Sequence, residues 1–271
     1  MMRKLSELIV LIRGGGEVAS GIAHRLHRSH FRVCLTETAN PVAVSRGTTF
    51  SEAVFDRVKT IMGVTAELVS ASTEEINTVW QRGNIPIVVD PDASIKDNIK
   101  PDVLVDATMA KRNIRTRITD APLVIGMGPG FYAGRDVHIV VETNHSSNLG
   151  KVILEGEAEE NTGIPVAIGG LTKERIVWAP QTGIFTTDRE IGDSVVAGEV
   201  VGRVGDLPLE APLSGMLRGL LRNGVTVSKG GKLIEIDPIN DRAICNFIAD
   251  KIRAIGEGVV KAIMLKFNTG V

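Results

Sequence analysis

The sequence predicts an α/β fold in which a mostly parallel sheet carries helices on its faces and a small β module follows. Three observations predict it. An apolar run at residues 8–12 leads into glycines 14–16 and then into a stretch with helical spacing. Further apolar runs alternate with helical segments, which is typical of a parallel sheet. From residue 179 the chain becomes rich in Gly, Val and Ile and repeats itself.

The first unit is a strand, a glycine loop, a helix and a second strand. A continuous apolar run ended by glycines is typical of a buried parallel strand. Apolar residues at Val18, Ile22 and Leu26 give one residue per helical turn. Residues 31–35 form the second predicted strand, which ends at Glu37. This order is one βαβ unit, and with its glycine motif it predicts a Rossmann-like sheet.

The middle of the chain predicts more strands and one capped helix. Residues 59–69 are expected to form a hairpin through Gly63. Residues 73–81 are expected to be helical, with Ser72 as N-cap and Gly83 as the C-terminal stop. Four further strands are predicted at residues 85–89, 103–105, 123–125 and 137–141.

An internal repeat defines the β module. Residues 179–185 match residues 211–217 at an offset of 32, and glycines and aliphatic residues continue the match. Two copies of one small β unit predict a sandwich or barrel with approximate two-fold symmetry. Residues 244–266 then have the spacing of an amphipathic helix, which is expected to pack on the first domain. Gly256 and Gly258 weaken its middle, so the alternatives are two helices or one helix with a kink. We therefore expect domains at residues 1–175, 176–238 and 239–271.

Composition excludes several classes of function. Among 271 residues the net charge is −1 and aromatic residues are 4%, so no nucleic-acid partner is expected. Two distant cysteines, Cys34 and Cys245, indicate a reducing compartment and neither a disulfide framework nor a metal site. No run is long enough for a signal peptide or a membrane span, so a cytoplasmic protein without a membrane partner is expected.

The first glycine loop predicts a nucleotide site. Gly14-x-Gly16-x-x-Ala19, with Gly15 between, directly follows a strand and opens a helix. Such a loop approaches a pyrophosphate closely, and the helix directs its N–H groups at the anion. Glu37 ends the next strand, where a ribose hydroxyl would accept a carboxylate partner. The alternative is a tight turn without a ligand and, for Glu37, a solvated strand end.

Two further segments are candidates for the same site. Gly126, Gly128 and Gly130 follow another strand, at the sheet edge where open α/β sheets bind ligands. Asp106 ends a strand, and Lys111 and Arg112 follow it with side chains suited to phosphate or carboxylate oxygens. The alternatives are a plain chain reversal and a solvated charge pair.

No catalytic set is recognisable, so the protein is not assigned as an enzyme. His138 and Glu142 share one face of a predicted strand, as an acid/base pair or, in the favoured interpretation, as an ordinary polar face. Cys245 opens the predicted terminal helix, where a thiol is activated; a buried, inert cysteine is the commoner case.

The order of these segments resembles the selenium-dependent molybdenum hydroxylase system protein family, YqeB. The matching segments are residues 13–21, 50–54, 105–107, 110–113, 126–131, 136–138, 141–143 and 161–165. Residues 144–148 depart from the arginine-glycine-histidine stretch that such proteins carry at this point.

The resemblance implies an accessory factor for maturing a molybdenum hydroxylase. Its first region looks like the Rossmann domain of XdhC accessory proteins, which implies a nucleotide-type cofactor such as molybdopterin dinucleotide or NAD. The implied partner is the hydroxylase apo-enzyme, with a homo-oligomer as a further expected assembly. The alternatives are an NAD(H)-dependent oxidoreductase and a non-catalytic nucleotide-sensing adaptor.

The repeat region resembles a biotinyl/lipoyl-like barrel-sandwich hybrid. Carrier domains of that type present a modified lysine at a hairpin tip, and residues 180–228 contain no lysine. A structural or docking module is therefore expected in place of a carrier.

Overall fold

The computed structural model describes residues 4–268, which divide into two compact units. Unit 1 comprises residues up to 41, residues 49–161 and residues from 248 onward. Unit 2 comprises residues 42–48 and 162–247. Residues 162–175 and 239–247, expected outside the β module, thus belong to the same compact unit as that module.

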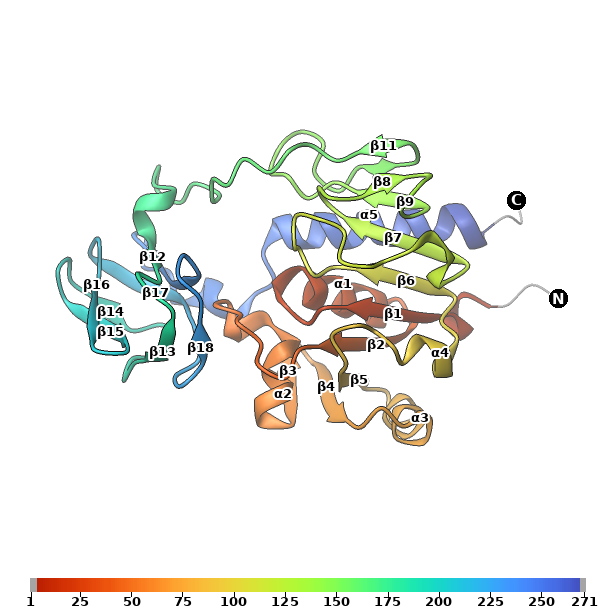
Figure 1. The fold of residues 1–271 in the computed structure, drawn as a ribbon, viewed down its shortest axis with the longest axis horizontal. Helices are drawn as coiled ribbons and strands as arrows, with labels where there is room; N and C mark the ends of the chain where they lie inside the picture. Colours follow the sequence, from red (N-terminus) through yellow and green to blue (C-terminus); the bar gives the residue numbers. More distant parts are fainter. Residues whose placement is uncertain (1–3, 269–271) are drawn as a thin grey trace. The chain divides into compact units, whose positions relative to one another are not determined.

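A nine-stranded sheet forms the centre of unit 1, in the order β10-β9-β7-β6-β1-β2-β5-β4-β3 (Figure 1). The neighbours from β4 to β9 run parallel, whereas β3 and β10 pair antiparallel at the two edges. The strands are β1 (Ile9–Arg13), β2 (Arg32–Glu37), β3 (Val58–Ile61), β4 (Val64–Val69), β5 (Ile85–Val89), β6 (Val103–Asp106), β7 (Leu123–Met127), β9 (Ile139–Val141) and β10 (Val152–Ile153). A separate pair joins β8 (Tyr132–Ala133) to β11 (Gly156–Glu157).

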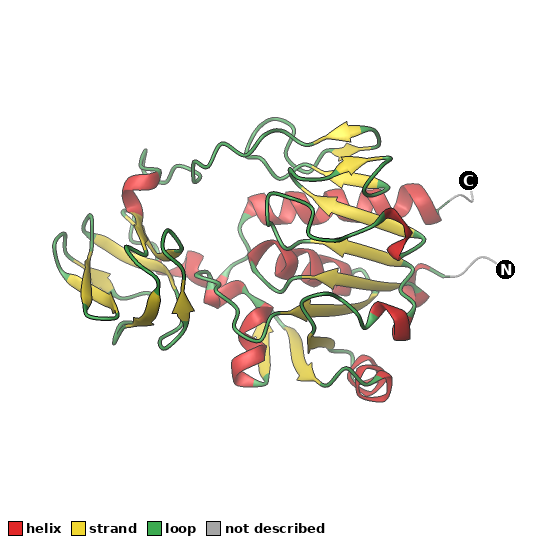
Figure 2. Ribbon diagram, in the orientation of Figure 1, coloured by secondary structure: helices red, strands yellow, loops and turns green. Residues whose placement is uncertain are grey.

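Two sets of helices cover the two faces of this sheet (Figure 2). Alternate strand residues such as Val10 and Ile12 pack with α1 (Glu17–Arg28) and α5 (Asp250–Phe267). The residues between them, such as Leu11, pack with the smaller α3 (Thr73–Gln81) and α4 (Lys96–Ile99). The period of two along each strand therefore produces a core on both faces. Short helical segments complete the unit: α2 (Ala53–Asp56) and 3-10 turns at Leu5–Glu7, Phe50–Glu52 and Ile118–Asp120.

The predicted Rossmann-like class is wrong, and the structure is a mixed α/β unit with a large mixed sheet. Strands and helices alternate in the first half only. Between β6 and β7 the chain forms a 3-10 turn, and between β7 and β9 it forms the short strand β8. The helix covering this half is α5, which contacts β7, β9 and β10 and comes from the end of the chain.

The capped helix and the hairpin were predicted correctly. Ser72 accepts a hydrogen bond from the Glu75 N–H at the start of α3, and Gly83 follows its end at a φ of +76°. The β3–β4 turn carries Gly63 at a φ of +80°.

The terminal helix differs from the prediction in its start and in the role of its glycines. A 3-10 turn, Arg242–Asn246, precedes α5, which then runs unbroken through Gly256 and Gly258. A Cβ on Gly258 would lie 2.4 Å from the Gly150 carbonyl oxygen. These glycines therefore permit close packing of α5, which offsets their low helix propensity.

Unit 2 consists of two four-stranded antiparallel sheets, β12-β19-β17-β14 and β16-β15-β13-β18. The strands are β12 (Ile176–Trp178), β13 (Gly183–Thr186), β14 (Ser194–Val195), β15 (Val200–Val204), β16 (Leu207–Glu210), β17 (Gly215–Leu220), β18 (Thr226–Val227) and β19 (Lys232–Asp237). Short 3-10 turns lie at Arg46–Thr48 and Lys173–Arg175. The first four strands recur about 32 residues later as the last four. The repeat pairs β12 with β16, β13 with β17, β14 with β18 and β15 with β19. When each strand is replaced by its repeat partner, the strand order of the first sheet becomes that of the second.

In residues 4–268, no helix has both the length and the apolar character needed to cross a membrane.

Candidate functional site

The loops that follow β1, β6, β7 and β9 pack against one another at the carboxyl ends of the strands. A Cβ on Gly14 would lie 3.1 Å from the Ala107 carbonyl oxygen. One on Gly130 would lie 2.6 Å from the Arg112 backbone, and one on Gly128 would lie 2.3 Å from Thr143 Oγ1. All three glycines also have positive φ. A side chain is therefore disfavoured both by the close contacts and by the backbone conformation. The sequence thus brings its predicted ligand loops together at one edge.

The first glycine loop is occupied by atoms of its own unit. The Gly14 N–H donates to the Thr36 carbonyl at 2.8 Å, and the Gly15 N–H donates to Glu37 Oε2 at 2.8 Å. The other carboxylate oxygen of Glu37 accepts from the Thr38 N–H at 2.7 Å. Glu37 therefore takes the backbone donor that a pyrophosphate was expected to use.

Gly16 and Ala19 have separate roles at the start of α1. A Cβ on Gly16, the N-cap, would meet no atom within 4 Å. Ala19 is fully buried against the sheet. The helix N-terminus is therefore open in front of Gly16, while Ala19 serves packing.

The second glycine loop also faces its own chain. A Cβ on Gly126 would lie 2.5 Å from the Phe131 ring, and Gly128 and Gly130 meet Thr143 and Arg112 as described above. These contacts explain all three glycines through packing, which favours the chain-reversal alternative.

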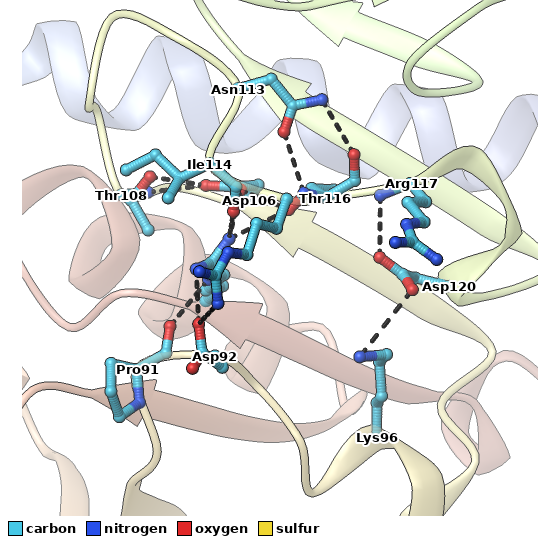
Figure 3. Close-up of polar contacts among 12 residues, drawn as sticks. Pro91, Asp92, Lys96, Asp106, Thr108, Asn113, Ile114, Thr116, Arg117 and Asp120 are labelled. Atoms are coloured by element: carbon cyan, nitrogen blue, oxygen red, sulfur yellow. Dashed lines mark hydrogen bonds and ion pairs between the residues drawn. The ribbon is translucent and has the colours of Figure 1, made fainter.

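Asp106 and Arg13 fasten the loop of residues 107–117 to the sheet edge. Asp106 is buried and accepts hydrogen bonds from the Thr108 N–H, the Thr108 hydroxyl at 2.7 Å and the Thr116 hydroxyl at 2.6 Å (Figure 3). Arg13 Nη1 lies 3.4 Å from Asp106 Oδ2, and the same guanidinium donates to the carbonyls of Pro91 and Ile114. Both charges are thus paired within the protein, so Asp106 is a structural residue.

Further polar contacts hold the remainder of this loop (Figure 3). The Asn113 amide donates to the Thr116 carbonyl at 2.8 Å, and the Thr116 N–H donates back to Asn113 Oδ1. Asp120 accepts from the Arg117 N–H and lies 3.8 Å from the Lys96 ammonium. The loop therefore has a defined shape around Lys111.

Lys111 and Lys251 are cations without an ion-pair partner among residues 4–268. Lys111 stands in the fastened loop, and Lys251 lies in the first turn of α5. Partial burial lowers the pKa of Lys111, and the positive charge of Lys251 lowers it further. Arg112 is exposed next to Lys111. Two neighbouring ammonium groups without a carboxylate favour binding of an anion.

The N-termini of α1 and α5 lie at the same end of the unit. A Cβ on Gly21 would lie 2.0 Å from Ile252, and one on Gly256 would lie 3.2 Å from Arg25. Residues therefore pair in ascending order along both helices, which makes them parallel. Because the N-terminal end of a helix carries partial positive charge, both helices add to the field of the two lysines.

His138 and Glu142 do not form an acid/base pair. His138 Nδ1 accepts a hydrogen bond from the Val124 N–H, and burial lowers the pKa of His138. The buried Glu142 carboxylate accepts from the N–H groups of Thr143, Asn144 and Glu159. The interpretation as an ordinary polar face is therefore correct. Asn144, Ser146 and Asn148, in the segment that departs from the family, all bond to Glu159.

Cys245 lies in a 3-10 turn of unit 2, five residues before α5, so the predicted activation by a helix N-terminus is wrong. Burial raises the pKa of its thiol and of the Cys34 thiol. Within residues 4–268, no group of three or more His, Cys, Asp or Glu side chains is arranged to hold a metal ion.

Lys251 is the candidate residue that sequence reasoning missed. A lysine in the first turn of a helix opposes the helix dipole, whereas acidic residues favour that position. This mismatch was visible in the sequence, but the position of Lys251 beside Lys111 depends on the packing of α5 against α1.

No protein-family model matches the chain. A protein of Escherichia coli (strain K12) described as "Uncharacterized protein YqeB" is 44% identical over 263 residues, which are 97% of this chain and 48% of that protein. The chain therefore spans about half the length of the curated relative that it matches. This similarity supports the family name YqeB; it shows neither the link to molybdenum hydroxylases nor an XdhC-like region.

Distant similarity also exists to solved structures. The product-bound ectoine utilization protein EutE (DoeB) from Ruegeria pomeroyi is 12% identical, with 79% of this chain and 61% of that chain covered and a TM-score of 0.24. An aspartoacylase family protein from Mesorhizobium loti is 12% identical, with 85% of each chain covered and a TM-score of 0.28. A succinylglutamate desuccinylase from Silicibacter sp. is 15% identical, with 85% and 84% covered and a TM-score of 0.26.

These findings correct the expected class and role. By their descriptions, none of the three is a Rossmann-type, biotinyl/lipoyl-type or molybdenum hydroxylase accessory protein. Neither the expected barrel-sandwich hybrid nor the accessory role, with its oxidoreductase and adaptor alternatives, is supported by these comparisons. TM-scores of 0.28 or less describe too distant a likeness to carry an activity over to this chain.

Proposed function

We propose that unit 1 binds a small anionic ligand, bearing a phosphate or carboxylate group, with Lys111 and Lys251 as its cationic contacts. The observation that carries the proposal is that the positive charge of Lys251 acts on Lys111 while neither lysine has an ion-pair partner among the described residues. The N-termini of α1 and α5 at the same end of the unit support it. A nucleotide-type ligand remains one phosphate-bearing candidate.

The surrounding charges explain why the two lysines are left for a ligand. Asp106, at the carboxyl end of β6, is already neutralised by Arg13. Glu37 is held by the N–H groups of Gly15 and Thr38. An incoming anion would therefore meet the lysines without competition from these two carboxylates.

Binding should fall as pH rises, because the anion is held by the charged form of each lysine. The pKa of Lys111 is lowered in the unliganded protein, so the fall begins below the range of an ordinary lysine. Replacing Lys251 by Met removes the second positive charge and moves the Lys111 transition to higher pH.

The experiment is a calorimetric titration of the full chain with inorganic phosphate, pyrophosphate, AMP, NAD and succinate. We expect at least one ligand to bind, and Lys111→Ala and Lys251→Ala each to weaken it by about tenfold or more, the effect of losing one charge-assisted hydrogen bond. Lys261→Ala is the matched control, because Lys261 is exposed on the same helix as Lys251.

The proposal is overturned if none of these anions binds, or if the lysine variants bind as tightly as the Lys261 control. Thermal unfolding of each variant without ligand separates lost binding from lost structure. Binding by AMP and NAD alone would identify a nucleotide-type ligand, whereas succinate alone would identify a carboxylate.

A further inference from the structure

A cavity of about 520 Å³ opens within unit 2 over the sheet β16-β15-β13-β18. Its lining includes Thr186 and Thr187 at the end of β13, Gly202 and Arg203 on β15, and Asn223. The register places Thr186 opposite Arg203, and both are exposed on the outer face of the sheet. The volume lies within the range of sites for small molecules.

Gly202, which lines the cavity, lies close to β13. A Cβ at this position would lie 2.9 Å from the Thr186 carbonyl oxygen and 3.0 Å from the Phe185 ring. The register between β15 and β16 also shifts between Val200 and Gly202. The irregular strand therefore brings Gly202 close to β13, and Arg203 follows it in the lining.

Some polar groups of the lining are already paired. The Thr187 hydroxyl donates to the Val201 carbonyl, and the Thr187 N–H donates to Asn223 Oδ1 at 3.0 Å. Arg189 donates to Glu199 and lies 3.8 Å from Asp188, whose side chain is 93% exposed. These contacts neutralise Arg189 and fix the orientation of the Asn223 amide.

Arg203 is the cation of the lining that lacks a carboxylate. Its Nη1 donates to the Asp206 carbonyl at 2.9 Å. Within residues 4–268 its Nε and Nη2 have no protein acceptor, and neither has the Asn223 amide nitrogen. Nε and Nη2 form one edge of the guanidinium, whose two parallel N–H groups match the two oxygens of a carboxylate.

We propose that this cavity binds a small organic carboxylate, held in bidentate fashion by the free edge of Arg203. The Asn223 amide, fixed by its bond to Thr187, donates to a second polar group of the same ligand. Nothing on the lining opposes the anion except Asp188, which extends into solvent. The site lies entirely within unit 2 and is independent of Lys111 and Lys251.

The test is a calorimetric titration of the full chain carrying Lys111→Ala and Lys251→Ala, which removes the proposed anion site of unit 1. The probes are acetate, succinate and citrate, with inorganic phosphate as the comparison. We expect a carboxylate to bind more tightly than phosphate, and Arg203→Lys to weaken it by about tenfold or more although the charge is kept. Asn223→Ala should weaken succinate and citrate more than acetate.

Arg28→Ala is the control, since Arg28 is exposed at the end of α1 in unit 1 and should leave binding unchanged. Absence of carboxylate binding, equal binding by Arg203→Lys, or preference for phosphate would each overturn the proposal. Because the lysine variants form the background, these outcomes leave the proposed function of unit 1 unaffected.

Discussion

Among the residues that the structure describes, each unit buries one arginine, and the two charges are compensated in different ways. In unit 1, Arg13 has one buried carboxylate partner, Asp106, and two backbone carbonyls. In unit 2, Arg175 shares Glu235 with Lys232 and donates to the Val166 carbonyl. Both arginines fasten a loop to a sheet. Charges that are paired within the protein therefore hold loops to the sheets, whereas Lys111, Lys251 and Arg203, which lack carboxylate partners among residues 4–268, lie on the surfaces that we propose bind ligands.

The largest effect is expected from breaking the buried pair of unit 1. Asp106→Ala leaves Arg13 buried without its close partner and frees three donors, so we expect a loss of about 3–5 kcal/mol in the free energy of unfolding. Urea denaturation measures it. Glu257→Ala is the control, because its pair with Arg25 is solvent-exposed and worth about 0–1 kcal/mol. Equal losses in the two variants would contradict the structural role of Asp106.

The buried pair of unit 2 should appear as acid sensitivity. Burial raises the pKa of Glu235, but the charges of Lys232 and Arg175 outweigh burial and hold that pKa at about 2, against an ordinary value of 4.5. Because the folded pKa is the lower one, the stabilisation is complete above the ordinary value and is lost as pH falls toward 2.

A shift of this size corresponds to about 3 kcal/mol. Glu235→Gln should therefore be less stable than the wild type near neutral pH, and the difference should shrink as pH falls from 4.5 to 2. Urea midpoints of both proteins across this range give the measurement. A difference that stays constant with pH would show that Glu235 acts through packing and not through its charge.

The limits of sequence-based prediction follow from the same residues. The hairpin, the capped helix and the repeat were predictable because each depends on a pattern visible in the sequence. These patterns are Gly63 in the hairpin turn, Ser72 at the helix N-cap and the fixed offset of 32 residues in the repeat. The glycine loops were located correctly, but the sequence analysis explained their glycines by a bound ligand. The structure explains them by packing between segments, such as Gly130 against Arg112, and the sequence pattern does not reveal such contacts. Lys251 was missed for the same reason, since its neighbour Lys111 precedes it by 140 residues.

The smallest effect tests how far the two halves of the repeat are equivalent. Gly183 and Gly215 occupy the same position of the repeat, each starting a strand with neighbours on both sides. A Cβ on Gly215 would lie 2.5 Å from the Asp237 carbonyl oxygen, whereas one on Gly183 would lie 3.0 Å from a methyl group of Val204.

Backbone cannot move aside as readily as a side-chain methyl, so Gly215→Ala should destabilise by about 2 kcal/mol and Gly183→Ala by less than about 1 kcal/mol. Urea denaturation of the two variants gives the comparison without further controls, because each is the other's reference. Equal losses would mean that the repeat is equivalent in packing as well as in strand order. A larger loss at Gly215 would show that the halves kept their shared strand order while their contacts diverged.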